Sequence, residues 1–300
     1  PTILTLNKTY SGPESETATG PNYPRQFTVK VDVAENQVVN NFVLQDILPD
    51  NLQFISLDSI SGSGSSTITD LNTPSTSSPG GTISRQFDSI TGTAASSDVS
   101  MTFSFYIPRD DASSNRVINT VSGDDVTSPN NAYAYGDWDP IDDRDNPAVV
   151  SGGSVGTPPE YTLNDKSIAI QKSVTNLSSP HSPGDILEYT YSIQISDYFA
   201  FEDLVITDLI SDGQHVLDSS QYIPRVAVNG NNGYTLSAVE MDSSNYDVIC
   251  DYSGTQGSEC TLDDGSPYSG DTTLELRISD ELVTQGRADG KLLGGCVPVG

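Results

Sequence analysis

Residues 25–33 read RQFTVKVDV, and this stretch decides the fold class. Its apolar side chains stand at every second position, which are Phe27, Val29, Val31 and Val33. Side chains alternate between the two faces of a strand, so the stretch predicts a half-buried antiparallel β-strand. Residues 101–107, MTFSFYI, alternate in the same way. Long apolar runs with the period of a helix are missing, so the sequence predicts an all-β protein.

An internal repeat divides the chain of 300 residues into two parts. LTLNKTY aligns with IAIQKSV, FTVKVDV with YTYSIQI, and FVLQDILPDNLQFI with LVITDLISDGQHVL. We therefore expect two tandem immunoglobulin-like antiparallel β-sandwich domains. The predicted first sandwich covers 1–125, an Asp/Pro/Gly-rich linker covers 126–163, and the second sandwich covers 164–300. The ending LLGGCVPVG reads like the middle of a domain, so we expect the second sandwich to be incomplete.

Charge and hydropathy exclude two kinds of partner. Thirteen basic residues stand against 41 acidic ones, and a net charge of −28 makes binding to a phosphate backbone implausible. We therefore expect no nucleic acid partner. The sequence holds no stretch near the ~20 apolar residues that span a bilayer, so we expect no membrane span in this chain. Its first residue is Pro1, and we expect a processed secreted protein or a piece of a longer one at the cell surface.

Two lysines stand on strand faces that are otherwise apolar. Lys8 alternates with leucines and a tyrosine in residues 4–10, and Lys172 alternates with isoleucines and a valine in residues 168–174. Burying an ammonium group costs several kcal/mol unless a partner neutralises it. Asp46 and Asp208 follow the two lysines at similar separations along the sequence, and each lies on the apolar face of a later predicted strand. We expect each lysine to meet its aspartate in a core.

The first copy also supplies an amide. In RVINTVSG, Asn119 shares a predicted face with two valines. Burial lowers the pKa of a lysine and raises that of an aspartate, which gives a neutral amine nucleophile and a proton-carrying acid. Attack of Lys8 on the Asn119 side chain would expel ammonia and form an isopeptide bond, with Asp46 as the promoting acid. The alternative is a buried salt bridge with Asn119 hydrogen-bonded beside it.

These motifs resemble those of fimbrial isopeptide-forming domains and of the related conserved-repeat domains of large bacterial and archaeal surface proteins. The resemblance rests on a lysine in the first strand, on VLQDILPDNLQF and VITDLISDGQHV, and on a late INT strand, VINTVSG. It covers residues 1–125 well and 165–220 fairly well. It implies that the lysine and asparagine are joined and that the acidic residue promotes the joining.

The second copy departs from this pattern. No asparagine stands in an INT context after residue 208. Three alternatives remain for this domain, in which Asp208 would be the promoting acid. The asparagine that reacts with Lys172 lies past residue 300, or it belongs to another chain, or the domain forms no crosslink.

Other candidate sites are less specific. Calcium is the cofactor that short acidic side chains in a loop suit, and one cluster at 136–146 has this character; its members are Asp137, Asp139, Asp142, Asp143 and Asp145. The alternative is a solvated linker. Cys250 and Cys260 flank a turn-rich loop and are predicted to form a disulfide. Asn7 and Asn176 stand in glycosylation sequons.

The sequence therefore favours a structural role. We expect a segment of an extracellular stalk, pilus, fibre or surface-layer protein, whose partners are other copies or neighbouring domains of the same surface protein. The alternative is a calcium-dependent adhesin that binds a glycan or host protein through loops such as 59–81 or 229–233. The many acids form no convincing catalytic pair for a glycosidase, so we expect no enzyme beyond a single self-crosslinking turnover.

Overall fold

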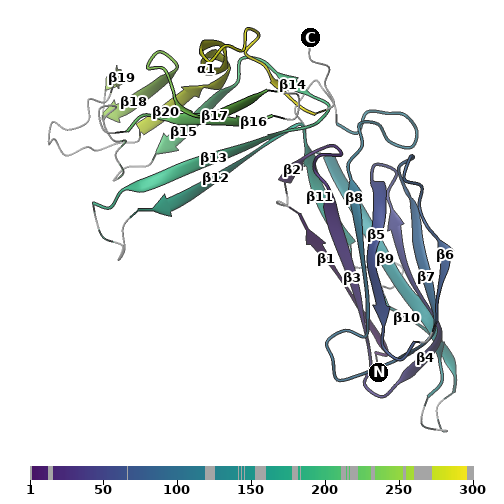
Figure 1. Cartoon of the computed structure of the whole chain (residues 1–300). Coiled ribbons are helices and arrows are strands. Elements are labelled where there is room, and N and C mark those ends of the chain that lie inside the picture. Colours follow the sequence, from purple (N-terminus) through teal and green to yellow (C-terminus); the bar gives the residue numbers. More distant parts are fainter. Residues whose placement is uncertain are drawn as a thin grey trace. The chain divides into compact units, whose positions relative to one another are not determined.

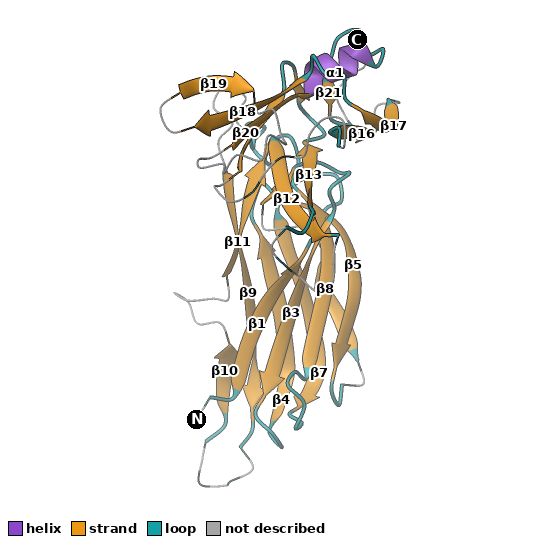
Figure 2. Cartoon of the chain, turned by 90° about the vertical axis from the view of Figure 1, so that its left-hand side faces the viewer, coloured by secondary structure: helices purple, strands orange, loops and turns teal. Residues whose placement is uncertain are grey.

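A computed structural model describes most of the chain and divides it into two compact units, 1–196 and 197–300 (Figure 1). The described residues are 2–12, 16–65, 67–118, 126–140, 142, 144, 146–152, 160–177, 182, 184–210, 214, 216, 222–230, 234–252, 255–259 and 272–295. Strands dominate both units, as the orange arrows of Figure 2 show. The predicted all-β class is confirmed.

The first unit contains a four-stranded antiparallel sheet in the order β1-β3-β8-β5. Its strands are β1 (Leu4–Ser11), β3 (Arg25–Val33), β8 (Val99–Tyr106) and β5 (Gln53–Gly62). The register places Lys8 opposite Val29 and Tyr10 opposite Phe27. In β3 the alternate residues from Arg25 to Val33 are buried, as the RQFTVKVDV pattern predicts.

The facing sheet has the order β2-β11-β9-β4-β7-β6, and β10 also pairs with β9. Its strands are β2 (Glu16–Ala18), β11 (Glu160–Lys166), β9 (Val126–Trp138), β4 (Val38–Leu48), β7 (Gly81–Thr91), β6 (Ile68–Asn72) and β10 (Ala148–Gly152). The inward side chains of both sheets form the core, and its largest fully buried members include Phe27, Phe42, Phe87, Phe103 and Phe105.

The predicted linker at 126–163 is wrong, because the described residues of this range form strands of the first sandwich. β9 lies in the interior of its sheet between β4 and β11, and alternate residues from Ser128 to Gly136 are buried. At least one of the glycines that suggested a linker, Gly136, is required by the packing of β9 against β4. A Cβ on Gly136 would lie 2.6 Å from Val39 Cγ1 and 3.1 Å from the Phe42 Cα, so close strand packing requires glycine at this position.

A second hairpin follows β11 after a single residue, Ser167. β12 (Ile168–Asn176) and β13 (Leu187–Ile195) pair with each other, with Lys172 opposite Tyr191 and Val174 opposite Tyr189. Among the described residues they form a two-stranded sheet. Three hydrogen bonds join the end of β13 and Ser196 to the last residue of β2 and to the segment between β2 and β3. They run from Tyr23 Oη to the Ile195 carbonyl (2.7 Å), from the Ala18 N–H to Gln194 Oε1 (3.3 Å), and between the Thr19 and Ser196 hydroxyls (2.7 Å).

The second unit is also built from strands. Its four-stranded sheet has the order β15-β20-β18-β19, formed by β15 (Val205–Ile210), β20 (Thr272–Arg277), β18 (Tyr246–Tyr252) and β19 (Thr255–Glu259). Two further pairs are β16 (Arg225–Asn229) with β17 (Thr235–Glu240), and β14 (Ala200–Phe201) with β21 (Leu292–Leu293). A short helix, α1 (Ile278–Thr284), follows β20 directly and places Glu281 in a buried position.

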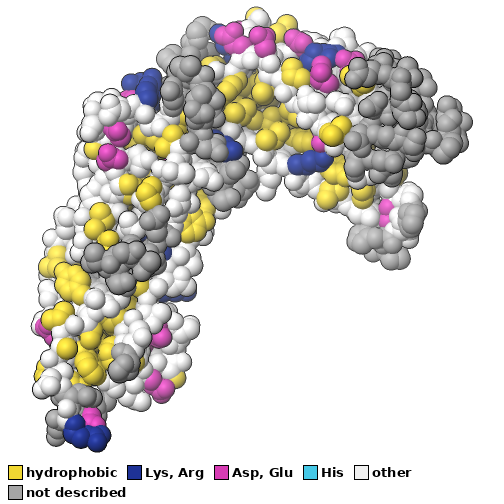
Figure 3. Space-filling view, turned by 180° about the vertical axis from the view of Figure 1, so that it is seen from behind, with side chains coloured by type: hydrophobic (Ala, Val, Ile, Leu, Met, Phe, Trp, Pro, Cys, Tyr) yellow, Lys and Arg dark blue, Asp and Glu magenta, His cyan; other side chains and the backbone are white. Residues whose placement is uncertain are grey.

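Apolar side chains also occur at the surface, as the yellow atoms of Figure 3 show. Leu209 is 63% exposed and Ile170 is 55% exposed. No helix in the described part of the chain is long and apolar enough to cross a membrane.

Candidate functional site: a buried lysine, aspartate and asparagine

Lys8 enters the core of the first sandwich from β1. Leu4, Lys8 and the half-buried Leu6 and Tyr10 share one face of this strand, while Asn7 lies on the exposed face. The Lys8 side chain is only 1% exposed, and its Nζ lies 4.3 Å from the centre of the Phe27 ring and 5.8 Å from that of Phe103. The predicted burial of Lys8 is confirmed.

Asp46 reaches Lys8 from the opposite sheet. It lies on β4 between the buried residues Leu44 and Leu48 and is fully buried. Its Oδ2 accepts a hydrogen bond of 2.5 Å from Lys8 Nζ. Burial lowers the pKa of Lys8 and raises the pKa of Asp46, although their mutual attraction opposes both shifts. Both shifts lower the cost of moving a proton from the ammonium to the carboxylate, a transfer that would give a neutral amine beside a neutral acid.

Asn130 completes the cluster from β9, the strand next to β4. Asp46 is paired with Ala132, and Asn130 lies two residues from Ala132 on the same inward face. Asn130 is fully buried. Its amide lies close enough to Asp46 to favour the carboxylate, yet neither its Nδ2 nor its Oδ1 makes a hydrogen bond of ordinary geometry. A buried polar group without a partner costs about 1–3 kcal/mol. Hydrogen bonding within the fold therefore does not explain why an asparagine occupies this buried position.

The sequence motif VINTVSG points to a different asparagine, Asn119. Asn119 lies outside the described residues, so its place in the reaction stays a prediction. The signal for Asn130 was nevertheless present in the stretch NNAYAYGDW, where Asn130, Ala132, Ala134 and Gly136 occupy alternate positions. These small side chains do not have the β-branched and aromatic character that normally marks a strand, and Pro129 precedes Asn130.

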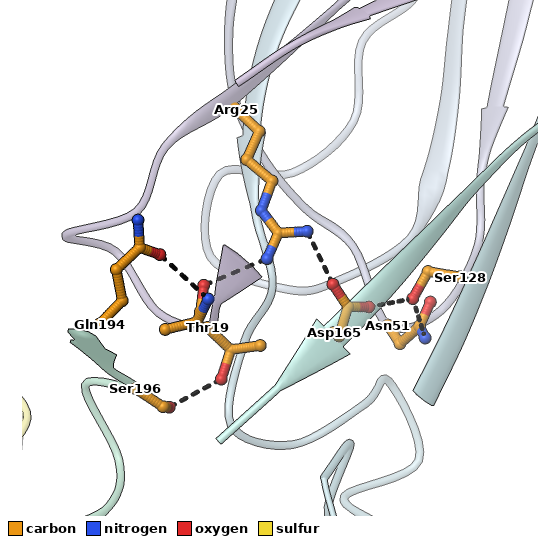
Figure 4. Close-up of polar contacts among 8 residues, drawn as sticks. Thr19, Arg25, Asn51, Ser128, Asp165, Gln194 and Ser196 are labelled. Atoms are coloured by element: carbon orange, nitrogen blue, oxygen red, sulfur yellow. Dashed lines mark hydrogen bonds and ion pairs between the residues drawn. The ribbon is translucent and has the colours of Figure 1, made fainter. Parts of the chain in front are cut away.

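The first sandwich contains a second buried polar cluster, built around Arg25 and Asp165 (Figure 4). Arg25 Nη1 on β3 donates a 2.7 Å hydrogen bond to Asp165 Oδ1 on β11, and both side chains are 0% exposed. Arg25 Nη2 also donates to the Ala18 carbonyl at 3.1 Å. The Ser128 hydroxyl on β9 donates to Asp165 Oδ2 at 2.5 Å and accepts from Asn51 Nδ2 at 2.7 Å. Burial raises the pKa of Asp165, against the attraction of Arg25.

The second predicted lysine has a different environment. Lys172 is exposed, so its predicted burial is wrong. Its Nζ lies over the Tyr189 ring at 4.4 Å and 5.8 Å from the Tyr191 ring. Asp208 lies on β15 between the buried residues Ile206 and Ile210, as its alternation predicts. Lys172 belongs to the first unit and Asp208 to the second, so their pairing stays a prediction.

The acidic cluster at 136–146 gives no evidence for calcium in its described part. Asp137 accepts a hydrogen bond from Asn41, and Asp142 pairs with the Arg144 guanidinium. This pairing lowers the pKa of Asp142. Asp143 and Asp145 lie outside the described residues, and the described residues contain no group of three potential metal ligands. Calcium binding by Asp137, Asp139 and their neighbours therefore stays a prediction.

The remaining predicted sites are tested only in part. Cys260 and Cys296 lie outside the described residues, and only the backbone of Cys250 is described, so the disulfide stays a prediction. No disulfide occurs among the residues that the structure describes. Asn7 is exposed, whereas Asn176 is half-buried and donates a 3.1 Å hydrogen bond to Asp185. Glycosylation of either stays a prediction.

Comparisons with known proteins find similar structures but no similar sequence. No family model and no curated protein matches the chain. Three of the similar structures are major pilin subunits. BcpA of Bacillus cereus is 6% identical with a TM-score of 0.34, and the match covers 66% of this chain and 60% of the pilin. A 35 kDa C-terminal fragment of GBS80 of Streptococcus agalactiae is 11% identical with a TM-score of 0.32, and the match covers 78% of this chain and 75% of the fragment. SpaD of Corynebacterium diphtheriae is 12% identical with a TM-score of 0.31, and the match covers 92% of this chain and 50% of SpaD.

The similar structures thus include pilin subunits, the kind of protein expected from the sequence motifs. The chain spans 60% of the length of the Bacillus cereus pilin. TM-scores of this size, between 0.31 and 0.34, carry no information about function.

Proposed function

We propose that this chain is a structural segment of an extracellular fibre, pilus or similar surface assembly, and that its first sandwich forms an isopeptide bond between Lys8 and Asn130. The observation that carries the proposal is the fully buried Asn130 amide, which has no hydrogen bond of ordinary geometry and lies beside the buried Lys8–Asp46 pair. An amine, an acid and a carboxamide enclosed in one core are the reactants and the catalyst for amide exchange.

The reaction balances without any further reagent. Neutral Lys8 Nζ attacks Asn130 Cγ while protonated Asp46 donates its proton to Asn130 Oδ1, which gives a tetrahedral intermediate. Asp46 then carries a proton from Lys8 Nζ to Asn130 Nδ2, the Cγ–Nδ2 bond breaks, and ammonia leaves. As the Cγ–Oδ1 carbonyl reforms, the Oδ1 proton returns to Asp46. The products are one secondary amide, one ammonia molecule and the original carboxyl group. The site acts once on itself, which distinguishes it from an enzyme that turns over.

A covalent bond at this position suits a mechanical role. It joins β1 in one sheet to β9 in the other, so pulling apart the two layers of the sandwich would require breaking an amide. Loss of ammonia to solvent makes the bond effectively permanent. Such a segment resists shear and proteolysis, and its natural partners are other copies or neighbouring domains of the same surface protein.

Intact-mass measurement of the natively folded chain tests the proposal. We expect a mass lower than the sequence mass by one ammonia, with the full mass restored in Lys8→Ala, Asn130→Ala and Asp46→Ala. Peptide mapping should recover a joined pair of peptides that contain Lys8 and Asn130.

Matched controls separate the alternatives. Asn119→Ala should leave the ammonia loss unchanged. If Asn119→Ala abolished the ammonia loss and Asn130→Ala did not, Asn119 would be the reacting asparagine, as the sequence suggested. Loss of one water in place of ammonia would indicate a bond between Lys8 and Asp46. An unshifted mass would leave the buried salt bridge as the correct description of the site.

A further inference from the structure

β11 lies next to the strand that carries Asn130 and comes later in the sequence than Lys8, Asp46 and Asn130. β11 pairs antiparallel with β9, and its register places Tyr161 directly opposite Asn130. Tyr161 is half-buried, and its face of β11 continues with the buried residues Leu163 and Asp165. Residues directly opposite in an antiparallel pair project to the same side of the sheet. Tyr161 and Asn130 are therefore cross-strand neighbours on the core face of this sheet.

The Tyr161 ring belongs to the aromatic wall around Lys8. The Tyr161 ring centre lies 5.6 Å from that of Phe27 in an edge-on arrangement and 5.2 Å from that of Tyr10 in a stacked one. Phe27 is the ring over which Lys8 Nζ sits at 4.3 Å. Tyr161 therefore contacts the residue that holds the amine and lies opposite the residue that carries the amide.

The buried cluster of Figure 4 holds β11 in this place. Asp165 lies on β11 four residues after Tyr161, and it binds both Arg25 of β3 and Ser128 of β9. Arg25 is two residues from Phe27, and Ser128 is two residues from Asn130, each on the same inward face. The Asp165 carboxylate thus ties β11 to the two strands that carry Phe27 and Asn130.

We propose that Tyr161 is a positioning residue for the crosslink and that docking of β11 through Asp165 completes the site. This inference rests on the proposed Lys8–Asn130 reaction. Its consequence is an order of events: the bond forms after the chain has folded through residue 166. Before that stage the Asn130 side of the site lacks the ring that excludes water and restricts the amide. Because β12 begins at Ile168, the crosslink would set only when the strand leading into the next hairpin is in place.

The experiment uses the full chain, prepared unreacted in denaturant and refolded by dilution. Ammonia loss is followed by intact mass over time, and folding of the first sandwich is followed separately by fluorescence of Trp138, the single tryptophan. We expect Tyr161→Ser to slow ammonia loss by about tenfold or more, because small errors in placement have large effects on such reactions. Tyr161→Phe should restore the wild-type rate, since the ring and not the hydroxyl does the positioning.

Two further variants keep the test decisive. Tyr135→Ser changes an exposed tyrosine of β9 and should leave the rate unchanged. Asp165→Asn should slow the reaction although it touches neither Lys8 nor Asn130. If Tyr161→Ser does not regain native fluorescence, Tyr161→Leu takes its place, since it keeps apolar bulk without the ring.

The outcomes separate the two proposals. A wild-type chain that never loses ammonia contradicts the crosslink itself. A wild-type chain that reacts, together with folded Tyr161→Ser or Tyr161→Leu chains that react at the same rate, overturns only the role of Tyr161. A Tyr161→Phe chain as slow as Tyr161→Ser would also overturn it, because the ring would then be insufficient.

Discussion

The hairpin formed by β1 and β3 and the hairpin formed by β12 and β13 share one local geometry but differ in what covers it. Lys8 lies opposite Val29 with its Nζ over the ring two residues away, Phe27. Lys172 lies opposite Tyr191 with its Nζ over the ring at the equivalent position, Tyr189. The distances to these rings are 4.3 Å and 4.4 Å. Lys8 is buried and Lys172 is exposed.

The difference shows that the lysine motif alone does not make a reactive site. Both hairpins orient an amine over an aromatic face, which is a favourable contact for a cation. For Lys8, the described residues of the same unit supply a second sheet with a carboxyl group bonded to the amine and a buried amide next to that carboxyl group. Reactivity therefore depends on the facing layer, which excludes water and brings in Asp46 and Asn130.

The largest test of this comparison replaces the two aspartates. Asp46→Ala should destabilise the first sandwich by about 3–5 kcal/mol, because it leaves the Lys8 ammonium buried without its partner, and it should also prevent the crosslink. Asp208→Ala should cost the second unit about 1 kcal/mol or less, because the Asp208 side chain is only half-buried. Denaturant unfolding measures both, with Trp138 fluorescence for the first unit and circular dichroism for the second.

The control for this prediction is a Lys8→Met/Asp46→Leu double variant. It removes both charges and fills their space, so it should be much more stable than Asp46→Ala alone. Equal losses for Asp46→Ala and Asp208→Ala would show that the two sites are alike and would remove the contrast between the hairpins.

Local alternation in the sequence predicted half of the reactive site. Lys8 and Asp46 lie in regular stretches where every second residue is apolar, so their burial follows from strand geometry alone. β4 contains a bulge near Asn41, which adopts a positive φ of 48°, but this irregularity precedes the stretch that carries Asp46. The alternation of buried and more exposed residues from Leu44 to Leu48 is therefore undisturbed.

The other half depends on contacts that local sequence does not encode. Asn130 lies in a strand of small residues whose composition is typical of a loop, and its place in the sheet comes from pairing with β4 and β11. Lys172 shows the converse error. Its strand alternates as regularly as that of Lys8, but burial requires a facing layer, which is a long-range property. Alternation identifies the face of a strand and leaves open what packs against that face.

The next test concerns pH. Burial lowers the pKa of Lys8, so the unfolded chain keeps its proton up to a pKa near 10.5 while the folded chain releases it earlier. The unfolding free energy then rises as pH increases toward 10.5, by at most about 1.4 kcal/mol per pH unit. We expect this slope in the Asn130→Ala variant, which cannot form the crosslink. It is measured by denaturant unfolding of the first unit, followed by Trp138 fluorescence, between about pH 8 and pH 10.

Asp46, Tyr10 and Tyr161 lie near the same amine, so the slope is taken as a difference between two variants that both keep these residues. The control is Asn130→Ala/Lys8→Met, which keeps those groups and lacks the amine. Asn130→Ala/Lys172→Met should keep the full slope. A slope that disappears with Lys172→Met and persists with Lys8→Met would reverse the assignment of the buried lysine.

The smallest expected effect belongs to Lys172→Met in the otherwise unchanged chain. An exposed cation over an aromatic ring contributes about 0.5–1 kcal/mol, and methionine retains much of the contact between the side-chain stem and Tyr189. The unfolding free energy should therefore fall by less than about 1 kcal/mol, and intact mass should still show the loss of one ammonia. A loss of stability as large as that of Asp46→Ala would mean that Lys172 is enclosed in the assembled protein, because only a desolvated amine with a partner gives an effect of that size.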